Sequence, residues 1–229
     1  MSNELIRIEH VTKTYGTKIK TDVLKDINLT FEKGSFNWII GASGSGKTTL
    51  LNIISGLDTA TSGKVKIDGI ELSTLNIKER AHFRSTHLGF IFQFHYLLPE
   101  FTALQNILMP LRIQKKKIDQ SVKDQALELM NEVGISHVSH HYPNQMSGGE
   151  QQRTAVARAI IGQPLLILAD EPTGNLDSHS AESVYQLLRK LHQTYKTTFI
   201  IITHDKITPE KGDRLLTLKD GTLIKDVIY

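Results

Sequence analysis

Apolar and polar residues follow one another in two regular patterns along this chain of 229 residues. Residues 5–11 and 64–67 alternate loosely between the two types, which predicts strands with one buried face. Continuous apolar runs instead predict strands that are buried on both faces, as in a parallel sheet. Such runs lie at residues 88–92 and 165–169, and the largely apolar segments 36–40 and 198–202 predict two further strands. The dipeptides Asp68-Gly69 and Asp220-Gly221 follow or separate apolar segments and predict hairpin turns.

Apolar residues at helical spacing lie between these strands. One such stripe follows the run at 36–40, and another follows the run at 165–169. Residues 94 to about 160 are predicted to be mainly helical, with one stripe stopped by Gly134. Strand–helix alternation predicts an α/β fold with a largely parallel sheet, and the N-terminal segments predict a small antiparallel sheet beside it.

Composition limits the cellular compartments that fit this chain, but it does not indicate a function. The chain has no Cys, which fits a reducing compartment, and its formal charge of +3 does not by itself indicate nucleic acid. The N-terminus lacks the basic and apolar regions of a signal peptide, and no apolar run reaches the length of a membrane span. We therefore expect a soluble protein whose membrane role, if any, comes through a partner chain.

One stretch matches the phosphate-binding pattern G-x-x-x-x-G-K-[ST] between a predicted strand and a predicted helix. Glycines let the backbone curl around phosphate oxygens, while N–H groups and the positive helix end face the anion. Lys47 supplies a point charge for the β- and γ-phosphates, and Thr48 supplies a hydroxyl for Mg²⁺. The stretch comprises Gly41, Ala42, Ser43, Gly44, Ser45, Gly46, Lys47, Thr48 and Thr49.

Four polar residues stand at the carboxyl ends of predicted strands, where ligands gather in α/β sheets. Asp170 can hold Mg²⁺, and Glu171 can orient or deprotonate the attacking water. Gln93 can bridge the metal or merely satisfy backbone groups at a strand end. His204 can bind the γ-phosphate, although a histidine at a strand end often has no such role.

A second anion site is predicted where Ser147, Gly148 and Gly149 precede another helix. One nucleotide does not easily need two such cradles within one small domain. Two copies arranged head to tail would give each ATP a phosphate loop from one copy and a Ser-Gly-Gly corner from the other.

Together these stretches resemble the motifs of an ABC transporter ATP-binding subunit, in the order of that family. The resemblance assigns Walker A to 41–49, the Q-loop to Gln93, the signature to 146–151, Walker B to 166–171, the D-loop to 175–177 and the switch histidine to His204. It implies a single ABC ATPase domain over residues 1–229. This domain would have a P-loop NTPase (RecA-like) core at 1–93 and 161–229 with an antiparallel β subdomain, and a helical signature subdomain at 94–160. It further implies ATP and Mg²⁺, an ATP-sandwich homodimer with Asp177 at the nucleotide, and Tyr15 on the adenine rather than a plain surface turn.

The departures from the family pattern are small. The signature has Met146 where Leu is usual and Glu150 where Gln is usual, and the D-loop reads Gly-Asn-Leu-Asp rather than Ser-Ala-Leu-Asp. Since Ser147 and Glu171 are present, we expect a hydrolytically competent subunit.

Residues 92–103 and 169–177 are similar to a narrower group of lipoprotein-releasing, macrolide-export and cell-division ATPases. This implies a membrane permease that docks near Phe94–Phe101, placing the protein on the inner face of the cell membrane; the plain alternative is that this apolar loop is local core. Export or extraction of a lipoprotein, peptide or antibiotic-like substrate is favoured, and a non-transporting regulator of the cell-division type is the alternative. No pattern for nucleic acid stands out. The histidines 137, 140 and 141 lack the Cys or carboxylate spacing of a metal site.

Overall fold

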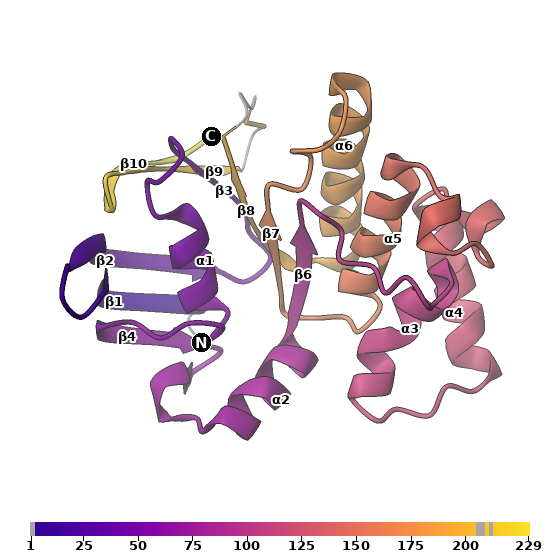
Figure 1. Cartoon of the computed structure of the whole chain (residues 1–229), viewed down its shortest axis with the longest axis horizontal. Helices are drawn as coiled ribbons and strands as arrows, with labels where there is room; N and C mark the ends of the chain where they lie inside the picture. Colours follow the sequence, from indigo (N-terminus) through magenta and orange to yellow (C-terminus); the bar gives the residue numbers. More distant parts are fainter. Residues whose placement is uncertain (1–2, 205–208, 211–212) are drawn as a thin grey trace. The chain divides into compact units, whose positions relative to one another are not determined.

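The computed structural model describes residues 3–204, 209–210 and 213–229. The chain forms two compact units, which are described one at a time (Figure 1). The first comprises Met1–Arg84 and Thr198–Tyr229, and the second comprises Ser85–Thr197. These bounds differ from the predicted subdomains, because the second unit adds two strands and a helix to the region 94–160.

An antiparallel sheet opens the first unit, with the order β2-β1-β4-β5. Buried residues alternate with exposed ones along its strands, and the register sets Ile6 opposite Phe31 and Ile8 opposite Leu29. Its hairpin turns at Asp68-Gly69, where φ values of 49° and 81° fit the tight turn predicted from the dipeptide. The strands are β1 (Glu4–Tyr15), β2 (Thr21–Glu32), β4 (Ser62–Ile67) and β5 (Ile70–Glu71).

The second sheet segment of this unit contains two of the strands predicted from apolar segments. β3 (Phe36–Ile40) runs parallel to both β8 (Thr198–Thr203) and β9 (Arg214–Lys219), and β10 (Thr222–Ile228) returns antiparallel to β9. Every residue of β8 is buried, which explains its uninterrupted apolar sequence. The last two strands form the hairpin predicted at Asp220-Gly221.

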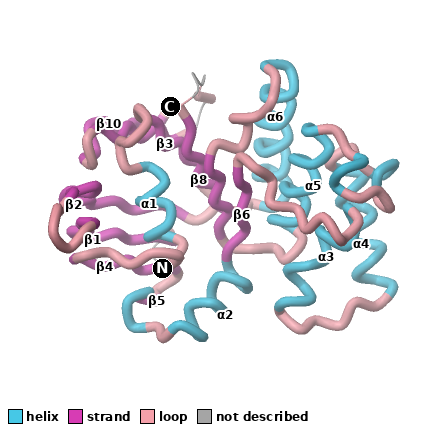
Figure 2. Tube along the Cα trace, in the orientation of Figure 1, coloured by secondary structure: helices cyan, strands magenta, loops and turns pink. Residues whose placement is uncertain are grey.

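Helical segments complete the described part of the first unit (Figure 2). α1 (Lys47–Ile54) follows β3, and a 3₁₀ turn at Leu72–Thr74 precedes α2 (Ile77–His87), which leads on into the second unit. Only Phe83 of α2 is buried. The helix therefore carries no apolar stripe that sequence reasoning could detect.

The second unit combines two parallel strands with several helices. β6 (Leu88–Phe92) and β7 (Leu166–Asp170) align so that Phe92 lies opposite Asp170. At Gly89 a Cβ would lie 2.3 Å from the carbonyl oxygen of Ala159, so glycine permits the close approach of a helix to β6. The helices are α3 (Ala103–Ile113), α4 (Gln120–Glu132), α5 (Gly148–Ile160) and α6 (Ser178–Tyr195), with 3₁₀ turns η2 (Ser136–Val138) and η3 (Pro143–Gln145).

Candidate functional site

The phosphate loop links β3 to α1 in the first unit, as its strand–helix setting predicts. Gly46 caps α1 with φ at 101°, a conformation that favours glycine. At Gly41 a Cβ would lie 2.2 Å from the carbonyl oxygen of Leu218 and 2.7 Å from Ser45 Oγ. Side chains at these two positions would collide with fixed structure, so the glycines allow the curl of the loop.

Lys47 and Ser45 place buried polar side-chain atoms at the phosphate loop. Lys47 is buried, and its ammonium donates to the carbonyl oxygens of Gly41 (2.8 Å) and Ala42 (3.1 Å). Ser45 Oγ is also buried and has no hydrogen-bond partner among the residues that the structure describes. A buried cation and an unpartnered buried hydroxyl at a helix N-terminus fit a phosphate group.

Tyr15, at the end of β1, is held by a small charged cluster in the same unit. Its hydroxyl donates to Asp58 Oδ2 at 2.6 Å, and Lys13 Nζ lies 4.6 Å from the ring centroid and 2.7 Å from Asp58 Oδ1. Burial raises the pKa of Tyr15, as does Asp58, whereas a hydrogen bond with Thr49 of the phosphate loop opposes the rise. The phenol is thus tied to the loop, and Tyr15 as a whole remains 41% exposed.

Lys13 and Asp58 were not found from sequence, because a lone lysine and a lone aspartate carry no motif. Burial acts to raise the pKa of Asp58, but hydrogen bonds from Lys13 and Tyr15 outweigh it and lower the pKa. An ionised carboxylate therefore fixes both partners in place.

In the second unit, β6 and β7 end side by side. Because Phe92 and Asp170 are register partners, Gln93 and Glu171 leave the same edge of the parallel pair. Glu171 takes a left-handed conformation with φ at 48°, and its carbonyl oxygen accepts from the Gly174 N–H at 3.1 Å. Non-glycine residues at such angles are uncommon and concentrate at functional positions.

The side chain of Gln93 lies against the D-loop. Its Nε2 donates to Asn175 Oδ1 at 3.2 Å, while Asn175 Nδ2 donates to the Gln93 carbonyl oxygen at 3.1 Å. A Cβ on Gly174 would lie 2.7 Å from Gln93 Nε2. The Gly-Asn departure from the usual D-loop therefore makes room for this glutamine and gives it a partner.

Ser147 caps α5, the signature helix, and Asp177 caps α6. Ser147 forms a capping box with Glu150, whose carboxylate also contacts His137. Asp177 accepts from the backbone N–H groups of His179 and Ser180 and from the Ser180 hydroxyl. The hydrogen bonds from Ser180 lower the pKa of Asp177. Its place in the nucleotide site stays a prediction beside this observed capping role.

The predicted site residues thus fall into two groups. Tyr15, the phosphate loop 41–49 and His204, which is exposed just after β8, belong to the first unit. The second unit holds Gln93, Ser147, Gly148, Gly149, Asp170, Glu171 and Asp177. Thr48 in the first unit and Gln93 and Asp170 in the second carry a hydroxyl, an amide and a carboxylate, which are ligand types that Mg²⁺ accepts, and their shared role stays a prediction.

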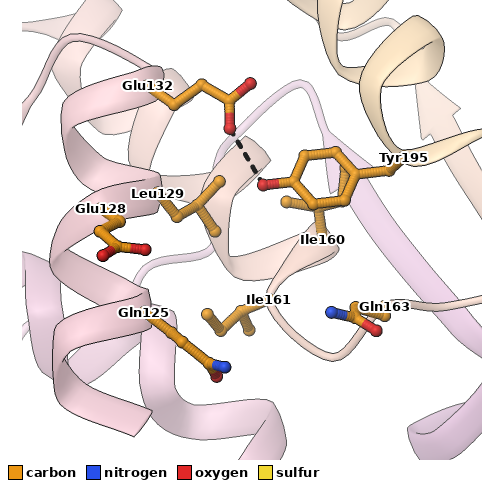
Figure 3. A pocket seen from close by; sticks show the side chains of 8 residues that line it. All are labelled: Gln125, Glu128, Leu129, Glu132, Ile160, Ile161, Gln163 and Tyr195. Carbon is orange, nitrogen blue, oxygen red and sulfur yellow. Dashed lines mark hydrogen bonds between the residues drawn. The ribbon is translucent and has the colours of Figure 1, made fainter. Parts of the chain in front are cut away.

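None of these residues lines a hollow of about 200 Å³ in the second unit (Figure 3). There the Tyr195 hydroxyl donates to Glu132 at 3.0 Å, and the remaining walls are glutamine, glutamate and aliphatic side chains. The hollow is separate from the predicted chemistry. Within the described part of the chain, no helix is long and apolar enough to cross a membrane.

Comparisons with known proteins agree with these motifs. The profile of a family described as ABC transporter matches residues 24–174. The lipoprotein-releasing system ATP-binding protein LolD of Cytophaga hutchinsonii is 47% identical over 96% of this chain and 99% of its own length. The protein of the same name from Shewanella frigidimarina is 49% identical, over 96% of this chain and 92% of its own.

Solved structures extend the likeness to three dimensions. The dimeric ATP-binding cassette MJ0796, described in a post-hydrolysis state bound to ADP and Pi, has a TM-score of 0.89 at 39% identity. A second dimeric structure of MJ0796, described as a bacterial ABC transporter cassette, has the same score at 40% identity. Each alignment covers 98% of both chains.

Proposed function

Because this chain belongs to the ABC transporter family as an ATP-binding and ATP-hydrolysing subunit, we propose that it powers the release of lipoproteins from a membrane. Lipoproteins are proposed as the cargo because the chain is 44–49% identical, over nearly its full length, to proteins named for lipoprotein release. In this role the protein sits on the inner face of the membrane through a permease.

Two copies bind ATP between them in this proposal. Lys47 and the N–H groups of the phosphate loop bind the β- and γ-phosphates, and Tyr15 stacks on the adenine. Ser147, Gly148 and Gly149 of the other copy bind the γ-phosphate from the opposite side. Binding thus joins the copies, and hydrolysis separates them.

Thr48, Gln93 and Asp170 would hold Mg²⁺, which when bound neutralises charge on the phosphates. Glu171 accepts a proton from, or orients, the attacking water, and His204 donates to the γ-phosphate. General-base assistance of this kind is typically worth about 10²–10⁴ in rate.

Glu171→Gln tests this cycle. The variant should bind ATP, accumulate as a dimer and hydrolyse at least about 100-fold more slowly, because the amide cannot take the proton. Glu128→Gln, an exposed glutamate on α4, is the matched control and should turn over normally. Wild-type turnover in Glu171→Gln would reject the assignment.

The docking loop, residues 94–101, is the proposed contact with the permease. Phe94, Tyr96 and Leu98 are 65%, 63% and 38% exposed. Three large apolar side chains on one short loop are costly to leave in water and are typical of an interaction surface. This exposure supports docking over the plain alternative of local core.

Two helices hold the backbone of the docking loop. The Arg158 guanidinium on α5 donates to the carbonyl oxygens of His95 and Tyr96, each at 2.6 Å, and both residues have positive φ. Asn106 on α3 is fully buried and bonds both the N–H and the carbonyl oxygen of Leu98. A preformed loop loses little conformational freedom when it docks.

Leu98→Asp should preserve ATP binding and abolish stimulation of the ATPase by the permease that co-purifies from membranes. Leu127→Asp on α4 is the matched control, since Leu127 is 39% exposed and lies outside the loop. Equal stimulation of both variants would reject the docking role.

The cargo is tested by reconstituting the chain with that permease and measuring lipoprotein release from proteoliposomes. ATP-dependent release supports the proposal. Stimulated hydrolysis without release of any lipoprotein would favour the non-transporting regulator instead.

A further inference from the structure

The N-terminus of α5 carries a chain of three hydrogen-bonded side chains. Glu150 Oε2 accepts from both the backbone N–H and the hydroxyl of Ser147, each at 2.8 Å. The other oxygen, Oε1, lies 2.7 Å from His137 Nε2 on η2. Glu150 is the signature residue that departs from the family's usual glutamine, and His137 is one of three histidines with no role assigned so far.

Glu150 is ionised at neutral pH. The Ser147 backbone N–H, the Ser147 hydroxyl and His137 all lower the pKa of this carboxyl, in that order of size, against a smaller effect of burial. An ionised carboxylate can only accept, so His137 Nε2 carries the hydrogen it shares with Glu150. That donor is available in the imidazolium and in one tautomer of the neutral ring.

For the helix alone, this carboxylate is favourable, because it caps free N–H groups at the positive end of the dipole. For ATP binding, however, the Glu150 carboxylate is unfavourable. Its charge lies one turn from the corner that receives the γ-phosphate, and it holds the hydroxyl hydrogen that Ser147 would donate to that phosphate.

We propose that His137 is a positioning residue for the nucleotide site, which offsets the Glu150 carboxylate and so frees the Ser147 hydroxyl for the γ-phosphate of the partner copy. This inference rests on the proposed function. By donating to Oε1, His137 withdraws charge from the oxygen that holds Ser147. The capping box itself uses only Oε2 and does not need the histidine.

A purely stabilising role explains the contact less well. The His137 side chain is 65% exposed, and ion pairs in such positions contribute little to stability. The contact between η2 and the first turn of α5 places His137 Nε2 beside the charge of the Glu150 carboxylate at the N-terminus of α5.

The experiment measures the ATP concentration that half-converts the chain to dimer, by size exclusion, in the Glu171→Gln background. His137→Ala should raise this concentration about two- to fivefold, which lies within the range expected for a partly exposed ion pair. His140→Ala, an exposed histidine three residues further along, is the control and should leave it unchanged. In a Glu150→Gln background, His137→Ala should have no effect, because no carboxylate remains to offset.

A merely structural contact would give a different result. His137→Ala would then lower the melting temperature in both backgrounds and leave the ATP requirement unchanged, and this outcome overturns the inference. An equal rise in the ATP requirement with Glu150 or Gln at position 150 also overturns it. If the Glu171→Gln chain itself fails to dimerise with ATP, the proposed function falls and this inference falls with it.

Discussion

We expect the substitution Gly174→Ala to lower the ATPase rate while changing the free energy of unfolding very little. Gly174 lies outside the left-handed region, so the backbone accepts alanine without strain. The new Cβ would lie 2.7 Å from Nε2, 2.9 Å from Cδ and 3.2 Å from Cγ of Gln93. These are atoms of a flexible side chain, so Gln93 swings away and loses its bond to Asn175.

The expected change in the free energy of unfolding is small because two effects oppose each other. Losing one side-chain hydrogen bond costs about 0.5–1.5 kcal/mol. Replacing glycine by alanine at a compatible site stabilises by about 0.4–1 kcal/mol, because the unfolded chain loses freedom. The balance lies within about 1 kcal/mol, which shifts the melting temperature by no more than roughly 2–4 °C for a chain of this size.

The ATPase responds differently, because in the proposed cycle Gln93 must reach Mg²⁺. Losing the interaction that positions its amide, worth about 0.5–1.5 kcal/mol, lowers kcat by roughly two- to twelvefold while KM for ATP changes little. Steady-state ATPase rates and a thermal melt on one preparation measure both quantities. Asn175→Ala removes the same partner and should give the same kcat.

Gly162→Ala is the control, since a Cβ there would approach Gln114 Nε2 only to 3.4 Å. An unchanged kcat in Gly174→Ala, or a loss equal to that of Gly162→Ala, would refute the positioning of Gln93 by the D-loop. A large drop in melting temperature would refute the separation of stability from activity.

Three further changes test other parts of the structure. Gly41→Ala would force a Cβ to 2.2 Å from the Leu218 carbonyl oxygen, so we expect destabilisation of about 1–3 kcal/mol and loss of fluorescent-ATP binding; wild-type affinity would contradict the fit of the loop. Asn106→Leu removes the buried amide under the docking loop and should cost about 2–4 kcal/mol in urea unfolding, and a cost below about 1 kcal/mol would contradict its role. Burial and the bond to Glu132 raise the pKa of Tyr195 to about 12 from 10.0. Its neutral form is therefore favoured in the folded chain, and this contribution to stability is complete below pH 10 and lost as the pH rises through 12. Ultraviolet titration should show a tyrosinate step near pH 12 that is lost in Tyr195→Phe, and a step of the same size near pH 12 in that variant would contradict the assignment.

Local patterns in the sequence predicted much of the fold. The hairpins at Asp68-Gly69 and Asp220-Gly221 follow from turn chemistry that needs only two adjacent residues, and strands β6 and β7 follow from their continuous apolar runs. Helix α2 was not predicted, because one buried phenylalanine makes no stripe.

The sequence by itself determined the family and the types of residue at the candidate site, since phosphate, metal and water each need particular chemical groups at short, fixed spacings. The tertiary structure alone decided which residues hold those groups: Asn175 beside Gln93, Asp58 beneath Tyr15 and His137 on Glu150. These contacts join residues between 13 and 82 positions apart. Such pairs leave no periodic trace in the sequence, because only the folded backbone brings them within hydrogen-bonding distance.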